Sequence, residues 1–103
     1  MSYEKAKAYG VFFGTLSNEN RLGILNVLRK DKLNVSEICE KTKLSQTLVS
    51  HNLKRLLHCG FVKKEIEGKY RYYTLNKNTI SPLLEIIDKH MKEYCIKIVR
   101  GKR

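Results

Sequence analysis

The sequence is poor in proline and cysteine, and each shortage excludes a class of protein. Proline occurs once in 103 residues, so the chain has no proline-rich linker. The three cysteines are an odd number, 20 and 36 residues apart, and do not form a disulfide framework. A cytoplasmic location, where thiols stay reduced, is therefore expected.

Long apolar runs are also missing. The longest stretch without Asp, Glu, Lys or Arg is Ala8 to Asn18, eleven residues, whereas a membrane span needs about 20 apolar residues. The stretch ends without the small-residue cleavage pattern of a signal peptide. We therefore expect no membrane partner, and a single domain over residues 1–103, because domains usually run about 100–150 residues.

Motifs of enzyme chemistry are absent. The sequence contains no P-loop, no G-x-G-x-x-G, no H-E-x-x-H and no paired C-x-x-C. Its histidines have no serine or cysteine partner at a spacing that suggests nucleophilic catalysis. We expect neither catalysis nor a cofactor.

Acidic residues are few, and this leaves a strong positive charge. Lys and Arg number 21 against 10 Asp and Glu, a formal net charge of +11. Nine basic residues and two acids lie between Lys41 and Lys77, so the charge is focused on the middle of the chain. Such a field predicts a polyanionic partner, nucleic acid ahead of a membrane surface, although charge can also serve solubility alone.

Hydrophobic spacing and turn residues predict a mainly α fold with five helices and one β-hairpin. The first helix is expected from Tyr3 to Gly14, the second follows an N-cap at Ser17 or Asn18, and the last begins near Ser81 with Pro82 at its first position. Residues 36–42 and 45–58 are two short helices with a brief turn between them. This arrangement is a helix-turn-helix, here residues 34–60.

The hairpin follows directly and forms a two-stranded wing over residues 61–76, which completes a winged helix-turn-helix. Gly60 is expected to end the preceding helix in a left-handed conformation. Glu67 and Gly68 are expected to form the two-residue turn of the hairpin.

The helix from Ser45 to His58 separates polar and apolar residues on opposite sides. Its polar stripe consists of Thr47, Ser50, His51, Lys54 and His58. The apolar side consists of Val49, Leu53, Leu56 and Leu57. Because the apolar side has to dock on the domain, the polar stripe is expected to face outward, where hydroxyl and imidazole groups can reach base edges. The alternative is a merely solvated face.

These patterns predict contacts with double-stranded DNA. Gln46 can pair with adenine, Thr47 can touch a thymine methyl group, and Ser45 suits a phosphate at the helix start. The predicted DNA-binding residues are Lys43, Ser45, Gln46, Thr47, Ser50, His51 and Lys54, with Lys64, Lys69 and Arg71 in the wing. For the wing charges, a solvated strand face is the alternative.

The last helix carries apolar residues at alternating steps of four and three, the spacing of a helix that packs along another long helix. We expect a homodimer in which residues 1–15 and 79–99 form the dimerisation helices. The predicted interface residues are Tyr9, Phe13, Leu84, Ile87, Met91, Tyr94 and Ile98. The alternative is burial of this stripe against the chain's own core.

Several short segments follow one another in a recognisable order. They are Leu16-Ser17-Asn18-Glu19-Asn20-Arg21-Leu22, Val35-Ser36-Glu37-Ile38, Leu44-Ser45-Gln46 with Val49-Ser50-His51, Gly60-Phe61-Val62, and Glu67-Gly68-Lys69 with Tyr72-Tyr73-Thr74-Leu75. In this order the segments resemble the ArsR/SmtB family of winged-helix repressors. The resemblance implies a homodimeric repressor that binds a palindromic operator and releases it when an effector binds.

The effector sites of that family are incomplete here. Asn34 and Ser36 stand where its thiolate site has cysteines, and Lys77 and Thr79 stand at two of the four zinc positions, leaving His90 and Glu93. We therefore expect no metal, and interpret His90 and Glu93 as an exposed helical pair.

Two other functions stay open. One is a metal- or thiol-responsive sensor that uses non-standard ligands such as His90 or Cys95 across the dimer. The other is a winged helix that binds a protein or RNA. Of the three cysteines, Cys59 is expected to be the most exposed, and its oxidation by peroxide is expected to weaken DNA binding.

Overall fold

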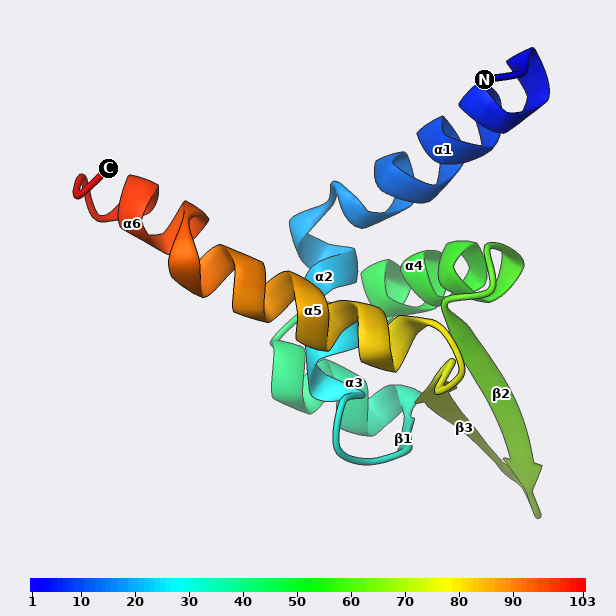
Figure 1. Ribbon diagram of the computed structural model, residues 1–103. Helices are drawn as coiled ribbons and strands as arrows, with labels where there is room; N and C mark the ends of the chain where they lie inside the picture. The colour runs from blue at the N-terminus through cyan, green and yellow to red at the C-terminus, as the bar shows by residue number, and fades with distance from the viewer.

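The computed structural model describes residues 1–103 as six helices and a three-stranded antiparallel sheet (Figure 1). The helices are α1 (Tyr3–Leu16), α2 (Glu19–Val27), α3 (Val35–Thr42), α4 (Gln46–His58), α5 (Ile80–Glu93) and α6 (Cys95–Val99). The strands are β1 (Leu33–Asn34), β2 (Val62–Glu67) and β3 (Tyr70–Leu75). The winged helix-turn-helix class is confirmed, but there is one more helix and one more strand than predicted.

Side-chain caps explain where α2 and α3 begin. Asn18, rather than Ser17, caps α2 by accepting from the backbone N–H of Arg21 at 3.0 Å. At the start of α3, Asn34 and Glu37 each accept from the other's backbone N–H at 2.9 Å, which makes a capping box. Because Asn34 is the cap, α3 begins at Val35, one residue before the predicted start.

The sheet has the order β1-β3-β2, and β1 is the strand that the sequence analysis missed. Two residues are enough for Leu33 to pair with Tyr73 at the base of the wing. In the hairpin, Glu67 pairs with Tyr70, so the tight turn is Gly68-Lys69, one residue later than predicted. Gly68 has a φ of 61°, a conformation that glycine adopts without strain.

The hydrophobic core lies between α2, α3, α4, the first half of α5 and the base of the sheet. Its fourteen buried residues include none from α1 or α6. Where α1 meets the body, Phe12 stacks on Phe61 with ring centroids 5.1 Å apart. The core therefore specifies the winged-helix body, and the two ends of the chain depend on it much less.

The prediction for the start of the last helix was wrong. Thr79 rather than Ser81 is the N-cap of α5, and the backbone N–H groups of Ile80 and Ser81 both donate to the Asn76 carbonyl. Pro82 is the third residue of the helix, where its missing N–H removes no helical hydrogen bond. At the other end, Tyr94 leaves the helical conformation with φ −124° and ψ −68°, so α6 is a separate short helix.

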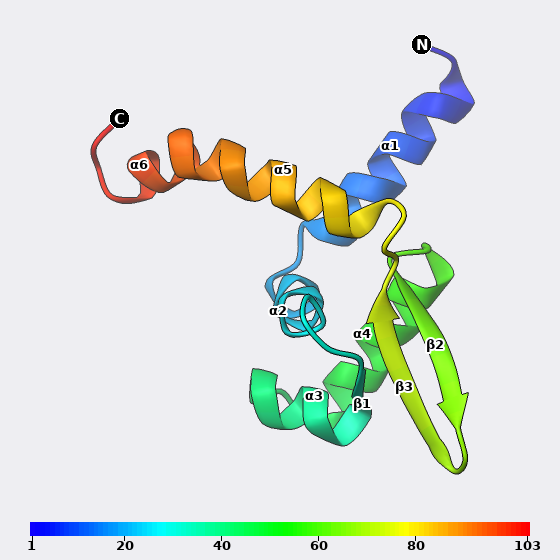
Figure 2. The same cartoon turned by 60° about the horizontal axis from the view of Figure 1, so that its bottom comes forward.

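The α1 and α5–α6 arms leave the body in different directions, and the wing extends toward the opposite end of the molecule (Figure 2). None of the helices has the length and apolar character needed to cross a membrane. The exposed sides of both arms carry large apolar residues, among them Tyr9, Phe13 and Ile98. Exposed apolar surfaces of this kind are typical of protein–protein interfaces.

Candidate nucleic-acid interface

Helix α4 has the two sides that its sequence predicts. Val49, Leu53 and Leu56 are at most 1% exposed and hold the helix on the core. All five residues of the polar stripe, on the opposite side, are exposed. The outward orientation of the stripe is therefore a property of the structure, whereas its contact with DNA stays a prediction.

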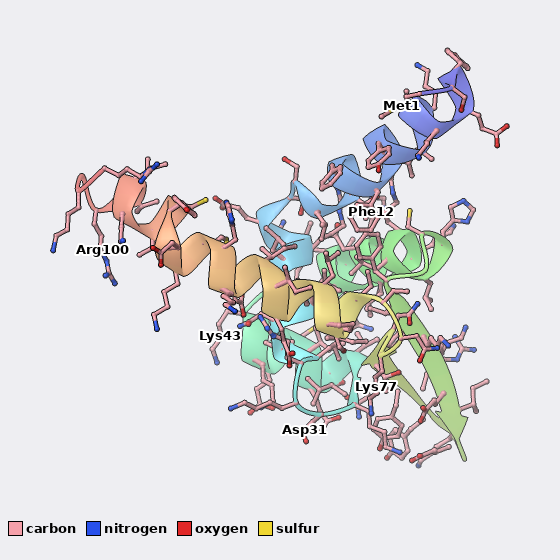
Figure 3. The ribbon with its side chains drawn as sticks, viewed as in Figure 1. Met1, Phe12, Asp31, Lys43, Lys77 and Arg100 are labelled. Carbon is pink, nitrogen blue, oxygen red and sulfur yellow. The ribbon has the colours of Figure 1, made fainter.

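The turn before α4 leaves the first turn of the helix exposed to solvent. Lys43 ends α3 in the left-handed conformation with φ 63°, and the Thr42 hydroxyl accepts from the Leu44 N–H at 3.3 Å. The Ser45 hydroxyl then caps α4 by accepting from the Leu48 N–H at 3.2 Å. Lys43 projects into solvent at this junction (Figure 3). A phosphate at this end of α4 would meet free backbone N–H groups and the positive end of the helix dipole.

The two faces of the wing differ in charge. Side chains alternate along a strand, so Lys64 and Ile66 share a face with the buried Val62 at the base of β2. Arg71 pairs with Ile66 and lies on the same face. At its base that face packs against the core that the helices form, so its outer part continues on the helix side of the sheet. Lys64 and Arg71 are both exposed there.

The opposite face of the wing contains the two acids of the middle segment, Glu65 and Glu67, together with Lys63. Lys32, from the turn before β1, hydrogen-bonds Glu67 and has its ammonium 3.9 Å from a Glu65 carboxylate oxygen. The hydrogen bond to Glu67 raises the pKa of Lys32 above its ordinary value. The same ammonium lies 5.4 Å from the centre of the Tyr72 ring. The acids are thus paired on the face opposite Lys64 and Arg71.

Lys32 was missed by sequence reasoning because its partners are about thirty-five residues away, and no local pattern signals that pairing. Lys69, by contrast, is in the tight turn itself, with its ammonium 5.5 Å from the centre of the Tyr70 ring. The ten predicted DNA-binding residues are all exposed. Together they extend from the α3–α4 turn along α4 to the wing tip.

The predicted dimer residues occupy three kinds of position. Leu84 is only 7% exposed and belongs to the core, as Ile80 does, so both residues pack against the chain's own body. Ile87 and Met91 are half-buried along an open groove of about 580 Å³ between α1, α2 and α5, which Phe13 also lines. Tyr94 and Ile98 are exposed, and the break at Tyr94 interrupts the predicted continuous stripe.

Comparisons with known proteins decide the family. A family described as "Bacterial regulatory protein, arsR family" matches residues 18–64. A transcriptional repressor SmtB homolog of Synechocystis is 30% identical over 90% of this chain and 70% of its own length. The arsenical resistance operon repressor of Bacillus subtilis is 32% identical over 79% of this chain and 78% of its own length. The chain belongs to the arsR family of bacterial regulatory proteins.

Solved structures agree. A homodimeric winged helix-turn-helix DNA-binding domain from Mycobacterium bovis, described as a possible ArsR-family regulator, superposes with a TM-score of 0.82 at 26% identity, covering 92% of this chain and 91% of that one. HlyU from Vibrio cholerae gives a TM-score of 0.74 at 28% identity, covering 91% of this chain and 99% of that one. The likeness includes the arms as well as the body, since it spans nine-tenths of the chain.

The metal-site positions of this ArsR-family chain have other structural roles. Asn34 caps α3 through its side chain, and Thr79 occupies the N-cap position of α5 without a side-chain hydrogen bond. His90 is exposed, and its ring centroid lies 4.8 Å from that of Tyr94. Within one chain no three His, Cys, Asp or Glu side chains come together as a metal site would require.

The cysteines are distributed differently from the prediction. Cys95 is exposed, whereas Cys39 and Cys59 are half-buried, so the expectation that Cys59 is the most accessible thiol was wrong. The sulfur of Cys59 lies 3.5 Å from the Thr15 hydroxyl, because the last turn of α1 covers the end of α4. Local sequence gave no sign of this contact between distant segments.

Proposed function

We propose that the chain is a homodimeric transcriptional repressor that binds a palindromic duplex operator. In this proposal α4 enters the major groove, and the wing contacts the adjacent backbone or minor groove. The observation that carries it is the exposure of two sets of side chains: the polar stripe of α4, and Lys64 and Arg71 on the wing face whose base packs against the helices. The two wing acids are on the other face, paired with Lys32.

The roles of individual residues follow from their places. Gln46, Thr47 and Ser50 lie in the first two turns of α4, where side chains meet base edges first. Lys43 and Lys54 suit phosphates on either side of the groove, and Lys69 suits a phosphate at the wing tip. The function is binding without catalysis, and a DNA partner requires a cytoplasmic location.

The arms supply the dimer in this proposal. Phe13 is 57% exposed, and the groove beside it, lined by Ile87 and Met91, is open. Covering these residues with a second copy removes apolar surface from water, which is the main driving force of stable association. The half-sites of the operator are expected about 10 base pairs apart, or a multiple of that spacing.

The test is selection of bound duplexes from a random pool, followed by affinity measurements at several salt concentrations. We expect a palindromic consensus, and a loss of affinity of about 10³-fold or more between 50 and 200 mM salt if about six phosphates are neutralised. Binding without a sequence preference, or equal binding to single-stranded RNA, would contradict the proposal. Repeating the selection with zinc, arsenite and peroxide tests whether an effector changes binding.

A further inference from the structure

One part of the Leu16–Leu22 motif has no place in the DNA contacts or in the dimer seam: the side chain of Arg21. It is half-buried in the angle between α1, α2 and α4. Its Nε donates to the Thr15 carbonyl at 2.6 Å, and its Nη2 donates to the Gly14 carbonyl at 3.3 Å. Its Nη1 donates to Oδ1 of Asn52 at 3.3 Å. A single guanidinium therefore joins the end of α1 to the middle of α4.

The α1 side of this contact needs a cation. Carbonyls in the last turn of a helix have no partner within the helix, and the helix dipole places negative charge there. The last turn of α1 has no basic residue of its own. Arg21 stabilises the C-terminal end of α1 because it supplies both the missing hydrogen-bond donors and the positive charge.

On the α4 side, the contact is made by the side chain of Asn52. Asn52 is 4% exposed, so it points into the protein and not toward DNA, although its neighbour His51 belongs to the polar stripe. Its Nδ2 donates to the Leu48 carbonyl at 2.9 Å, which leaves Oδ1 directed at Arg21. A buried amide with both ends bonded has one preferred orientation.

A second connection runs beside the first. Thr15 is completely buried and is the only buried residue of α1. Its hydroxyl donates to the Val11 carbonyl at 2.7 Å and accepts from Nε of Arg55, on α4, at 3.3 Å. We call Thr15, Arg21, Asn52 and Arg55 the Arg21 cluster.

The cluster matters because α1 has little else to fix its direction. It contributes no residue to the fourteen-residue core, and only two of its apolar residues, Phe12 stacked on Phe61 and Leu16, pack against that core from outside. Stacked rings tolerate sliding and rotation, whereas hydrogen bonds require defined distances and angles. The hydrogen bonds of the cluster therefore constrain the angle between α1 and α4 more tightly than the apolar contacts do.

We propose that Arg21 is a positioning residue for operator recognition, which sets the angle between the dimerisation helix α1 and the recognition helix α4. This inference rests on the proposed function. In a dimer joined through its arms, that angle determines how far apart the two recognition helices lie and how they are turned. Arg21 would thus select the spacing between half-sites without touching DNA.

The experiment uses the full-length protein and the palindrome selected by the wild type. The half-sites are moved apart and together in steps of one base pair, and each step shifts a half-site by about 3.4 Å and rotates it by about 34°. The quantity compared is the spacing ratio: the affinity at the best spacing divided by the affinity one base pair away. Arg21→Met removes the fork of donors but keeps a long, helix-compatible side chain.

We expect Arg21→Met to lower the spacing ratio about tenfold, equivalent to about 1.4 kcal/mol, while sedimentation still shows a dimer. The matched control is Lys30→Met. Lys30 is exposed and makes no hydrogen bond or ion pair, so its loss changes net charge by the same amount. The control is expected to lower the affinity by the same factor at every half-site spacing. An Arg21→Met protein that does the same would overturn the proposal.

Arg21→Lys and Thr15→Val decide the matter if Arg21→Met does not fold. Lysine keeps the charge but cannot reach both helices with a planar fork, and valine keeps the shape of Thr15 without its hydroxyl. Each is expected to lower the spacing ratio by a smaller factor, and unchanged ratios in both would overturn the proposal. If the wild type itself selects no palindrome, the proposed function fails instead, so the two failures are distinct.

Discussion

The winged-helix body and the two arms differ in whether their large apolar residues are buried or exposed. The body buries Ile38, Val49 and Leu56 completely and exposes a polar stripe. The arms expose Tyr9, Phe13 and Ile98, and the only buried residue of α1 is a threonine. One chain is therefore enough to make the body, whereas the arms present apolar surfaces that the single chain leaves uncovered. The comparison predicts that changes in the two regions affect different measurements.

The largest effect is expected from Phe61→Ala compared with Phe13→Ala. Phe61 is 1% exposed, so truncation leaves a cavity and should lower the free energy of unfolding by about 3–5 kcal/mol. Phe13 is 57% exposed in one chain, so its truncation should act only through the dimer. Urea titrations at several protein concentrations separate the two effects. If both variants lost the same free energy of unfolding at every protein concentration, the distinction between body and arms would be wrong.

Met91→Lys tests the arms directly. Met91 lines the open groove beside α1, and a lysine there would place an unpaired charge in the predicted seam. We expect a monomer in sedimentation, with an affinity for the palindrome about 10²–10⁴-fold lower, because linked binding is lost. Glu85→Lys, at an exposed position of the same helix, is the control and should remain dimeric. A monomer with full affinity for the palindrome would show that the seam is elsewhere.

Ser50→Ala tests base reading by α4. Removing the hydroxyl is expected to cost about 1–3 kcal/mol of discrimination at one base position and to leave the others unchanged. His51→Ala is expected to act in the same way at another position. Affinities for a set of single-mismatch duplexes measure the effect. Ser17→Ala, in the exposed turn between α1 and α2, should leave the pattern as it is.

The smallest effect is expected from the wing. Lys69→Ala should weaken all sequences alike and reduce the slope of log affinity against log salt by about one, as loss of one phosphate contact requires. Lys63→Ala is the control, since Lys63 lies on the wing face opposite Lys64 and Arg71. Equal slopes for Lys69→Ala and Lys63→Ala would show that the wing tip contacts no phosphate that Lys63 does not also contact.

Local sequence was a good guide wherever a structure is held by near neighbours. The caps at Asn18 and Ser45, the left-handed Gly60 and the two sides of α4 all follow from residues within a few positions of one another. The hairpin turn was misplaced by one residue because Gly68 fits either register, and cross-strand pairing with Tyr70 selects one. The break at Tyr94 has no proline or glycine to mark it.

The amino-acid sequence by itself determined the winged body, its charge and the outward side of the recognition helix, because periodicity and capping act over one or two turns. Tertiary structure alone decided that Lys32 pairs with the wing acids, that Leu84 belongs to the core, and that Arg21 joins α1 to α4. Each of these depends on groups that folding brings together from distant segments. Contacts between residues so far apart in the chain produce no periodic pattern in the sequence.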